Sequence, residues 1–146
     1  MLTRRALAAD DGTVLLLFPA AALVMIVLGA LVIDVSLSQV RARELESVAA
    51  SAANDALAAL DVDALRTNSE IRFDIDRAHA IVATAVAAGP LPSASVDIVT
   101  VTGMNTPRPE ISVTLTLVVE FVMAPALPGD LGSTTVTRTA TVSILG

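Results

Sequence analysis

Few residues in this sequence are of the types that carry out chemistry, and they do not form a recognisable set. There is one histidine, His79, and no cysteine, which excludes a cysteine nucleophile, a thiolate metal site and a disulfide. A lone imidazole makes a poor metal or catalytic site, so we expect His79 to lie at the boundary of a helix's buried stripe. Asp61 and Asp63 are spaced like metal ligands, but the glycine and closing glutamate of a calcium loop are missing, which favours a solvated turn.

Catalytic motifs are missing from the sequence as well. It has no glycine-rich phosphate loop, no HExxH and no GxSxG. We therefore expect a protein that is not an enzyme and that uses no cofactor and no metal.

The charge and the aromatic content argue against nucleic acid as a partner. The 146 residues include 9 basic and 15 acidic side chains, for a net charge of −6, and only 2% of the residues are aromatic. Binding to phosphates needs clustered positive charge, and stacking on bases needs aromatic rings. The chain has few basic residues relative to acidic ones and few aromatic residues, so we do not expect it to bind nucleic acid.

The elements that would position any site begin with one long apolar run. No charged residue occurs from Gly12 to Ile33, and about 20 such residues in a helix cross a hydrocarbon core of about 30 Å. This predicts a transmembrane helix over 13–33, which starts at Thr13, ends at Ile33 and contains Pro19 and Gly29. A buried core helix is rarely apolar on all sides, and a cleaved signal sequence has a shorter apolar region.

The arginines around this run bear on its orientation. Arg4 and Arg5 precede the run, and Arg41 and Arg43 follow it, so the count is equal on the two sides. The second pair starts farther from the run, which favours a cytoplasmic head over 1–12. We then expect residues 34–146 to be an extracytoplasmic domain of a single-pass cell-membrane protein.

Beyond the run, the pattern predicts that the helix continues over 34–60. This stretch has no glycine or proline after Asp34, and its apolar stripe is mostly alanine. Alanine lets another backbone approach closely. The stripe packs either on the protein's own sheet or on another subunit, and the sequence leaves both open. We call its four central residues the alanine seam: Ala49, Ala52, Ala53 and Ala56.

A second helix is expected over 74–88, after a polar break over 61–73 that ends in a short strand at 71–73. Asp74 is the expected N-cap, and Gly89-Pro90 is the expected stop. The buried stripe of this helix is expected to contain Ala78, Ile81, Val82, Ala85 and Val86.

The last third of the sequence alternates with period two, which is typical of strands. We expect strands at about 95–102, 110–123 and 134–145, joined as an antiparallel meander with one covered face. In the middle strand the covered set runs from Ile111 through every second residue to Phe121 and Met123. The predicted fold class is therefore α+β: a transmembrane helix that continues into a long amphipathic helix, a second helix and a small β-meander.

The first 60 residues contain a series of stretches in a distinctive order. Asp11-Gly12-Thr13-Val14 precedes an apolar span with Pro19, Val32-Ile33-Asp34-Val35 ends it, and Val40-Arg41-Ala42-Arg43-Glu44-Leu45 leads into an alanine-rich helix. This series resembles the TadE/TadG-like proteins of tight-adherence (Flp-type) pilus machinery. The resemblance implies a non-enzymatic minor pilin-like or accessory component, with other pilus or secretion-apparatus subunits as partners through the long helix. The alternative is a membrane-anchored extracytoplasmic binding or regulatory module unrelated to pili.

The same resemblance draws attention to Gly12 and Thr13 as a processing site. Prepilin peptidases cut pilins after a glycine at the edge of the span, and processed pilins typically carry glutamate five residues into the mature chain. That position is Leu17 here. We therefore expect the anchor to remain uncleaved.

Overall fold

The computed structural model describes residues 7–68, 71–103, 106, 108–123 and 132–144, with side chains of the first helix from residue 17 onward. The chain forms two compact units. One contains Met1–Leu37 and Phe121–Gly132, and the other contains Ser38–Glu120 and Ser133–Gly146.

The long helix α1 (Leu7–Ala56) begins in the first unit and ends in the second. It confirms that the apolar run and the segment after it form one helix, and it already begins inside the segment 1–12 predicted as a head. Pro19 lies within it. On its surface, Arg41 donates to Glu44 at 2.8 Å, one helical turn away, which contributes only tenths of a kcal/mol.

The helix ends slightly earlier than predicted. After α1, a 3₁₀ turn η1 (Leu57–Ala59) tightens the last turn, and Leu60 then forms an isolated antiparallel bridge with Phe73. The predicted short strand 71–73 is thus reduced to this single bridge.

The polar break contains a helix that the sequence analysis missed. α2 (Val62–Asn68) follows Asp61, whose Oδ1 accepts the backbone N–H groups of Asp63 at 3.1 Å and Ala64 at 3.0 Å. These are helix-capping bonds, since the first N–H groups of a helix have no partner inside it. Asp61 therefore caps a helix.

The second predicted helix is confirmed as α3 (Ile75–Ala88). Asp74 is its N-cap, and its side chain accepts the backbone N–H of Arg77 at 3.0 Å. Gly89 ends the helix and donates its N–H to the carbonyl of Val86. Its stripe is buried at Ala78, Val82 and Val86 and half-buried at Ile81 and Ala85.

Three antiparallel strands form the sheet in the order β1-β2-β3, which confirms the predicted meander. They are β1 (Ser95–Thr102), β2 (Glu110–Glu120) and β3 (Ser133–Ser143). At the turn after β1, Gly103 has φ 71° and accepts the backbone N–H of Thr106 at 2.9 Å. That left-handed backbone is why glycine suits this position.

One face of β2 is covered and the other is open. Alternate residues from Ile111 to Val119 are 5% exposed or less, as predicted. The prediction fails after Glu120, where the strand ends: Phe121 is only half-buried, and Met123 is 39% exposed. On the open face, hydroxyl groups of β2 and β3 pair at 2.9 Å: Ser112 with Thr141, Thr114 with Thr139, and Thr116 with Thr137.

A bulge in β1 changes which of its residues face the core. Val96 pairs with Leu115 and Ile98 pairs with Thr114, so Asp97 is an extra residue between them. The bulge turns Ile98 to the open face, where it is 56% exposed, and keeps Val99 packed against the core.

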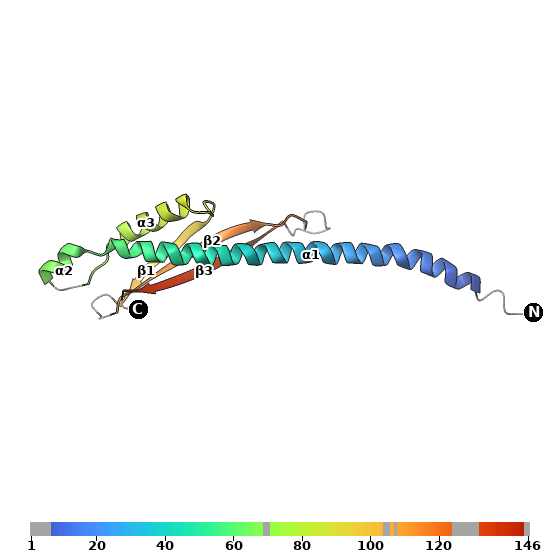
Figure 1. Cartoon of the computed structure of the whole chain (residues 1–146), viewed down its shortest axis with the longest axis horizontal. Coiled ribbons are helices and arrows are strands. Elements are labelled where there is room, and N and C mark those ends of the chain that lie inside the picture. Colours follow the sequence, from blue (N-terminus) through green and yellow to red (C-terminus); the bar gives the residue numbers. More distant parts are fainter. Residues whose placement is uncertain (1–6, 69–70, 104–105, 107, 124–131, 145–146) are drawn as a thin grey trace, which may run out of the picture. The chain divides into compact units, whose positions relative to one another are not determined.

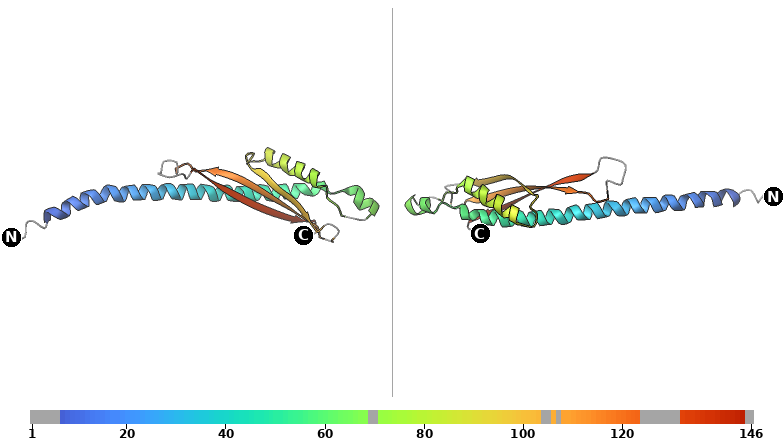
Figure 2. Two further views of the ribbon diagram at one scale, coloured as in Figure 1. Left: turned by 180° about the vertical axis from the view of Figure 1, so that it is seen from behind. Right: turned by 90° about the horizontal axis from the view of Figure 1, so that it is seen from above.

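The second unit has two layers with one core between them. In this unit α1 and α3 lie on the same face of the sheet, as Figures 1 and 2 show. The core joins the alanine-rich side of α1, the stripe of α3 and the covered face of β2. Its largest fully buried side chains include Leu45, Ile111 and Leu115.

Candidate functional site

The apolar part of α1 is exposed in the first unit. From residue 17 to Ile33 most of its large side chains are exposed, and Phe18 is 80% exposed and Met25 71% exposed. Among the described residues, one helix is long and apolar enough to span a membrane, with a window of mean hydropathy 2.5 of which 6% is buried. Gly29 faces open space, since an added Cβ would meet nothing within 4 Å.

Asp34 directly follows this apolar segment and is buried, with 3% of its surface exposed. Its Oδ1 accepts the backbone N–H groups of Val122 at 3.0 Å and Met123 at 3.1 Å, and its Oδ2 lies 3.2 Å from the second of these nitrogens. Bonds from N–H groups to a carboxylate are about twice as strong as neutral ones. This explains why Val122 and Met123 leave the β-ladder: their N–H groups point to Asp34.

The alanine seam is buried within the chain itself. Ala49, Ala53 and Ala56 are 0% exposed and Ala52 is 1% exposed, and all four belong to the core that includes β2 and α3. Small side chains here allow the helix backbone to lie close to the sheet. Of the two alternatives left open above, the chain's own packing accounts for the burial of this face.

A shallow groove of about 450 Å³ lies beside the seam, where α3 runs past α1. Its walls are mostly alanine and isoleucine, with one acidic and one basic side chain. The groove is lined by Asp55, Arg77, Ala80, Ile81, Thr84, Ala85 and Ala88. A second cavity of about 300 Å³ adjoins it and shares three of these residues. A small-molecule site usually buries most of its ligand, which a shallow groove does not do.

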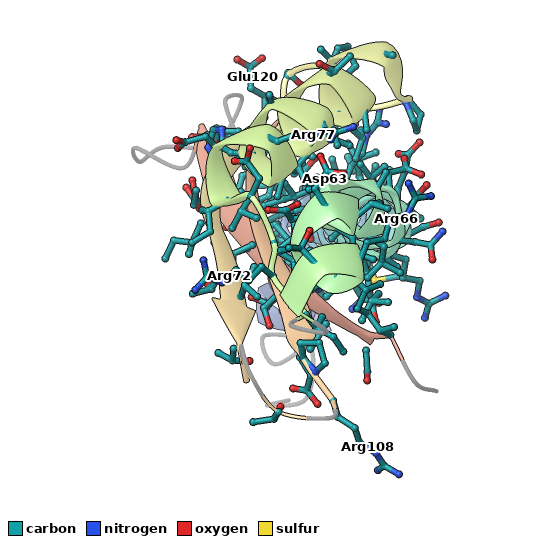
Figure 3. All side chains as sticks on the ribbon, turned by 90° about the vertical axis from the view of Figure 1, so that its left-hand side faces the viewer. Asp63, Arg66, Arg72, Arg77, Arg108 and Glu120 are labelled. Carbon is teal, nitrogen blue, oxygen red and sulfur yellow. The ribbon has the colours of Figure 1, made fainter. Side chains whose placement is uncertain are left out.

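The charged side chains labelled in Figure 3 spread around the second unit and do not converge. Asp61 and Asp63 are exposed, one as the cap before α2 and the other in its first turn, and His79 is exposed on α3, outside its buried stripe. Among the residues that the structure describes, no group of three or more His, Cys, Asp or Glu side chains is placed to hold a metal ion.

The remaining predicted residues lie along α1. Gly12 and Thr13 fall within its helical backbone, and Pro19 lies inside it. Ile33 is 51% exposed at the end of the apolar segment. These residues belong to the first unit, whereas the groove belongs to the second.

The contact made by Asp34 is the feature that sequence reasoning missed. A carboxylate at the end of an apolar run was visible in the sequence, but its partners follow 88 and 89 residues later in the chain.

Comparison with protein families, with curated proteins and with solved structures finds no match. The likeness to TadE/TadG-like proteins therefore rests on the stretches within residues 1–60.

Proposed function

We propose that this protein is a non-enzymatic, single-span membrane protein that works as a minor pilin-like or accessory component of a Tad/Flp-type pilus or secretion apparatus. Its N-terminus is cytoplasmic, and its α+β domain is extracytoplasmic. Its partners are the membrane and other subunits of the apparatus, and it uses no cofactor.

The observation that carries this proposal is the change in burial along one helix. In the first unit α1 exposes apolar side chains on all sides, as at Phe18, Leu23 and Ile26, and water does not favour such a surface. In the second unit the same helix buries the alanine seam and Leu45. A helix that is apolar all round at one end and amphipathic at the other suits an anchor that continues into a folded domain.

Orientation is tested with protease and two tags. Spheroplasts that express the chain with an N-terminal tag and, separately, a C-terminal tag are treated with protease. We expect the residues beyond Asp34 to be digested and the N-terminal tag to survive. Loss of the N-terminal tag in intact spheroplasts, with a cytosolic marker preserved, contradicts the orientation.

Assembly is tested by mass spectrometry of purified surface appendages and of membrane complexes captured with the tagged chain. We expect peptides from residues 34–146 in one of these fractions, together with other subunits of the apparatus. Capture of the chain alone, in cells that produce the appendage, contradicts the assembly role.

Processing is tested by the intact mass of the purified protein. A mass that corresponds to a chain beginning at Met1 would agree with an uncleaved anchor, whereas a mass that corresponds to a chain beginning at Thr13 would contradict it.

The alternative, a membrane-anchored binding or regulatory module, is supported by the groove between α1 and α3. Its polar side chains are Asp55, Arg77 and Thr84, and a small-molecule site is likewise mostly apolar with a few polar groups. Substituting Ala85→Trp would fill the groove. Under this alternative, the substitution abolishes regulation while assembly is unchanged.

A further inference from the structure

The chain that leaves β2 has an exposed apolar surface. We call Phe121–Met123 the exit segment. Val122 is 67% exposed and Met123 is 39% exposed, although both residues are apolar. The backbone N–H of Phe121 donates to the carbonyl of Gly132 at 2.9 Å, which closes the base of the β2–β3 connection.

Asp34 holds the exit segment beside α1. Its carboxylate accepts hydrogen bonds from the backbone N–H groups of Val122 and Met123, at 3.2 Å or less. All of these residues belong to the first unit. Because each helical residue rises only about 1.5 Å, the exit segment lies at the level where the apolar run ends.

We propose that the exit segment is a second membrane-contacting surface, which inserts into the headgroup and acyl boundary of the same bilayer that α1 crosses. This inference rests on the proposed membrane anchoring. It adds a contact made by a part of the chain nearly 90 residues away in sequence from the anchor.

The surroundings of Asp34 favour lipid as the occupant. Its neighbours on α1 are apolar and exposed: Val32 is 65%, Ile33 51% and Val35 50% exposed. The exit segment therefore continues an apolar surface that already belongs to the anchor. Within the exit segment charge does not oppose insertion, because Asp34 is buried and hydrogen-bonded and the sequence from Phe121 carries no further charge until Asp130. The exposed Glu120, directly before the segment, limits the insertion to the headgroup boundary, where a carboxylate stays hydrated.

The test uses the full chain in vesicles of phosphatidylcholine and phosphatidylglycerol. The sequence has no cysteine, so a single introduced cysteine is labelled uniquely with an environment-sensitive fluorophore. The probe is placed by Val122→Cys and, in a second variant, by Met123→Cys. Leu28→Cys in the apolar segment and Thr139→Cys on the open face of the sheet are the matched controls. Quenching is measured with nitroxide lipids and with aqueous iodide.

We expect the probes at Val122 and Met123 to be quenched by lipids that carry a nitroxide near the headgroup, with a several-fold smaller iodide quenching constant than the probe at Thr139. The probe at Leu28 should be quenched by a deep nitroxide. If Leu28 is quenched by lipid while Val122 and Met123 are quenched only by iodide, the anchor stands and this inference is wrong. Shielding of both probes from lipid and iodide alike would assign the surface to protein and would also overturn it. No lipid quenching at Leu28 refutes the proposed anchoring itself.

The role of Asp34 is tested in the same vesicles. Asp34→Ala removes the acceptor, so we expect the probe at Val122 to lose most of its lipid quenching and to gain iodide quenching. Ser36→Ala, at an exposed position two residues further along α1, is the control for a nearby change in the helix. Unchanged lipid quenching in Asp34→Ala would show that Asp34 does not hold the segment at the membrane.

Discussion

Overfilling the alanine seam tests whether the second half of α1 is packed against its own domain. The change is Ala49→Leu together with Ala53→Leu, two residues that are 0% exposed and one helical turn apart. Each substitution adds a branched side chain where the core has space for a methyl group. Overpacking of this kind costs about 1–3 kcal/mol per site.

The two sites contact each other, so their costs need not add, and we expect a loss of about 2–6 kcal/mol. A domain is typically stable by only about 5–15 kcal/mol, so this loss is large. With a urea m-value of about 2 kcal/mol/M, the unfolding midpoint should fall by roughly 1–3 M. The chain has no tryptophan or tyrosine for fluorescence, so the midpoint is measured by pulse proteolysis of the full chain in mild detergent.

The matched control is Ala50→Leu with Asn54→Leu, which adds leucines at the same spacing one position along the helix, where both residues are exposed. Its free energy of unfolding should stay within about 0.5 kcal/mol of the parent's. An unchanged midpoint for the seam variant would refute the internal packing of this face. If that variant also lost its membrane partners, the seam would belong to an interface between subunits.

Three further changes test other parts of the domain. Asp74→Ala removes the N-cap of α3 and should cost about 0.5–2 kcal/mol, measured as a lower midpoint in urea. Gly103→Ala should lower the free energy of unfolding by about 1–3 kcal/mol, because φ is positive there and the added Cβ would lie 2.8 Å from the hydroxyl of Thr106. The control is Gly132→Ala, whose added Cβ meets nothing within 4 Å and should be nearly neutral. In a double-mutant cycle, Thr114→Val and Thr139→Val should couple by about 0.2–1 kcal/mol, since their hydroxyls pair across the sheet, and strict additivity would contradict this.

The fold could be predicted wherever a local pattern was strong enough. The alternation from Ile111 to Val119 gave the face of β2, and Asp74 with Gly89 gave the ends of α3. The faces of β1 could not be predicted, because one bulged residue, Asp97, reverses the alternation there. α2 was missed because its seven residues are mostly polar and its cap, Asp61, also suits a turn.

The candidate site was predictable only in its local part. An apolar run identifies a candidate span by length and composition alone, and α1 contains it. The end of β2 was placed too late, because Phe121 and Met123 continue the alternation, although the N–H of Met123 bonds to Asp34 instead of to a strand. The end of β2 therefore depends on the carboxylate of Asp34, 89 residues earlier in the chain, and a local sequence pattern cannot show such a distant partner.

The sheet has two outer strands, and each carries a feature that discourages pairing with another chain. In β1 the bulge at Asp97 breaks the regular spacing of backbone groups. In β3, Arg138 pairs with the buried Leu115 and so lies on the side of the sheet that the helices cover, although at this edge its own side chain is exposed. An inward charge of this kind would be dehydrated if a foreign strand joined that edge. Copies anchored in one bilayer would be crowded in a plane at matching heights, where strand edges meet easily. Edges of this kind would limit β-aggregation between such crowded copies.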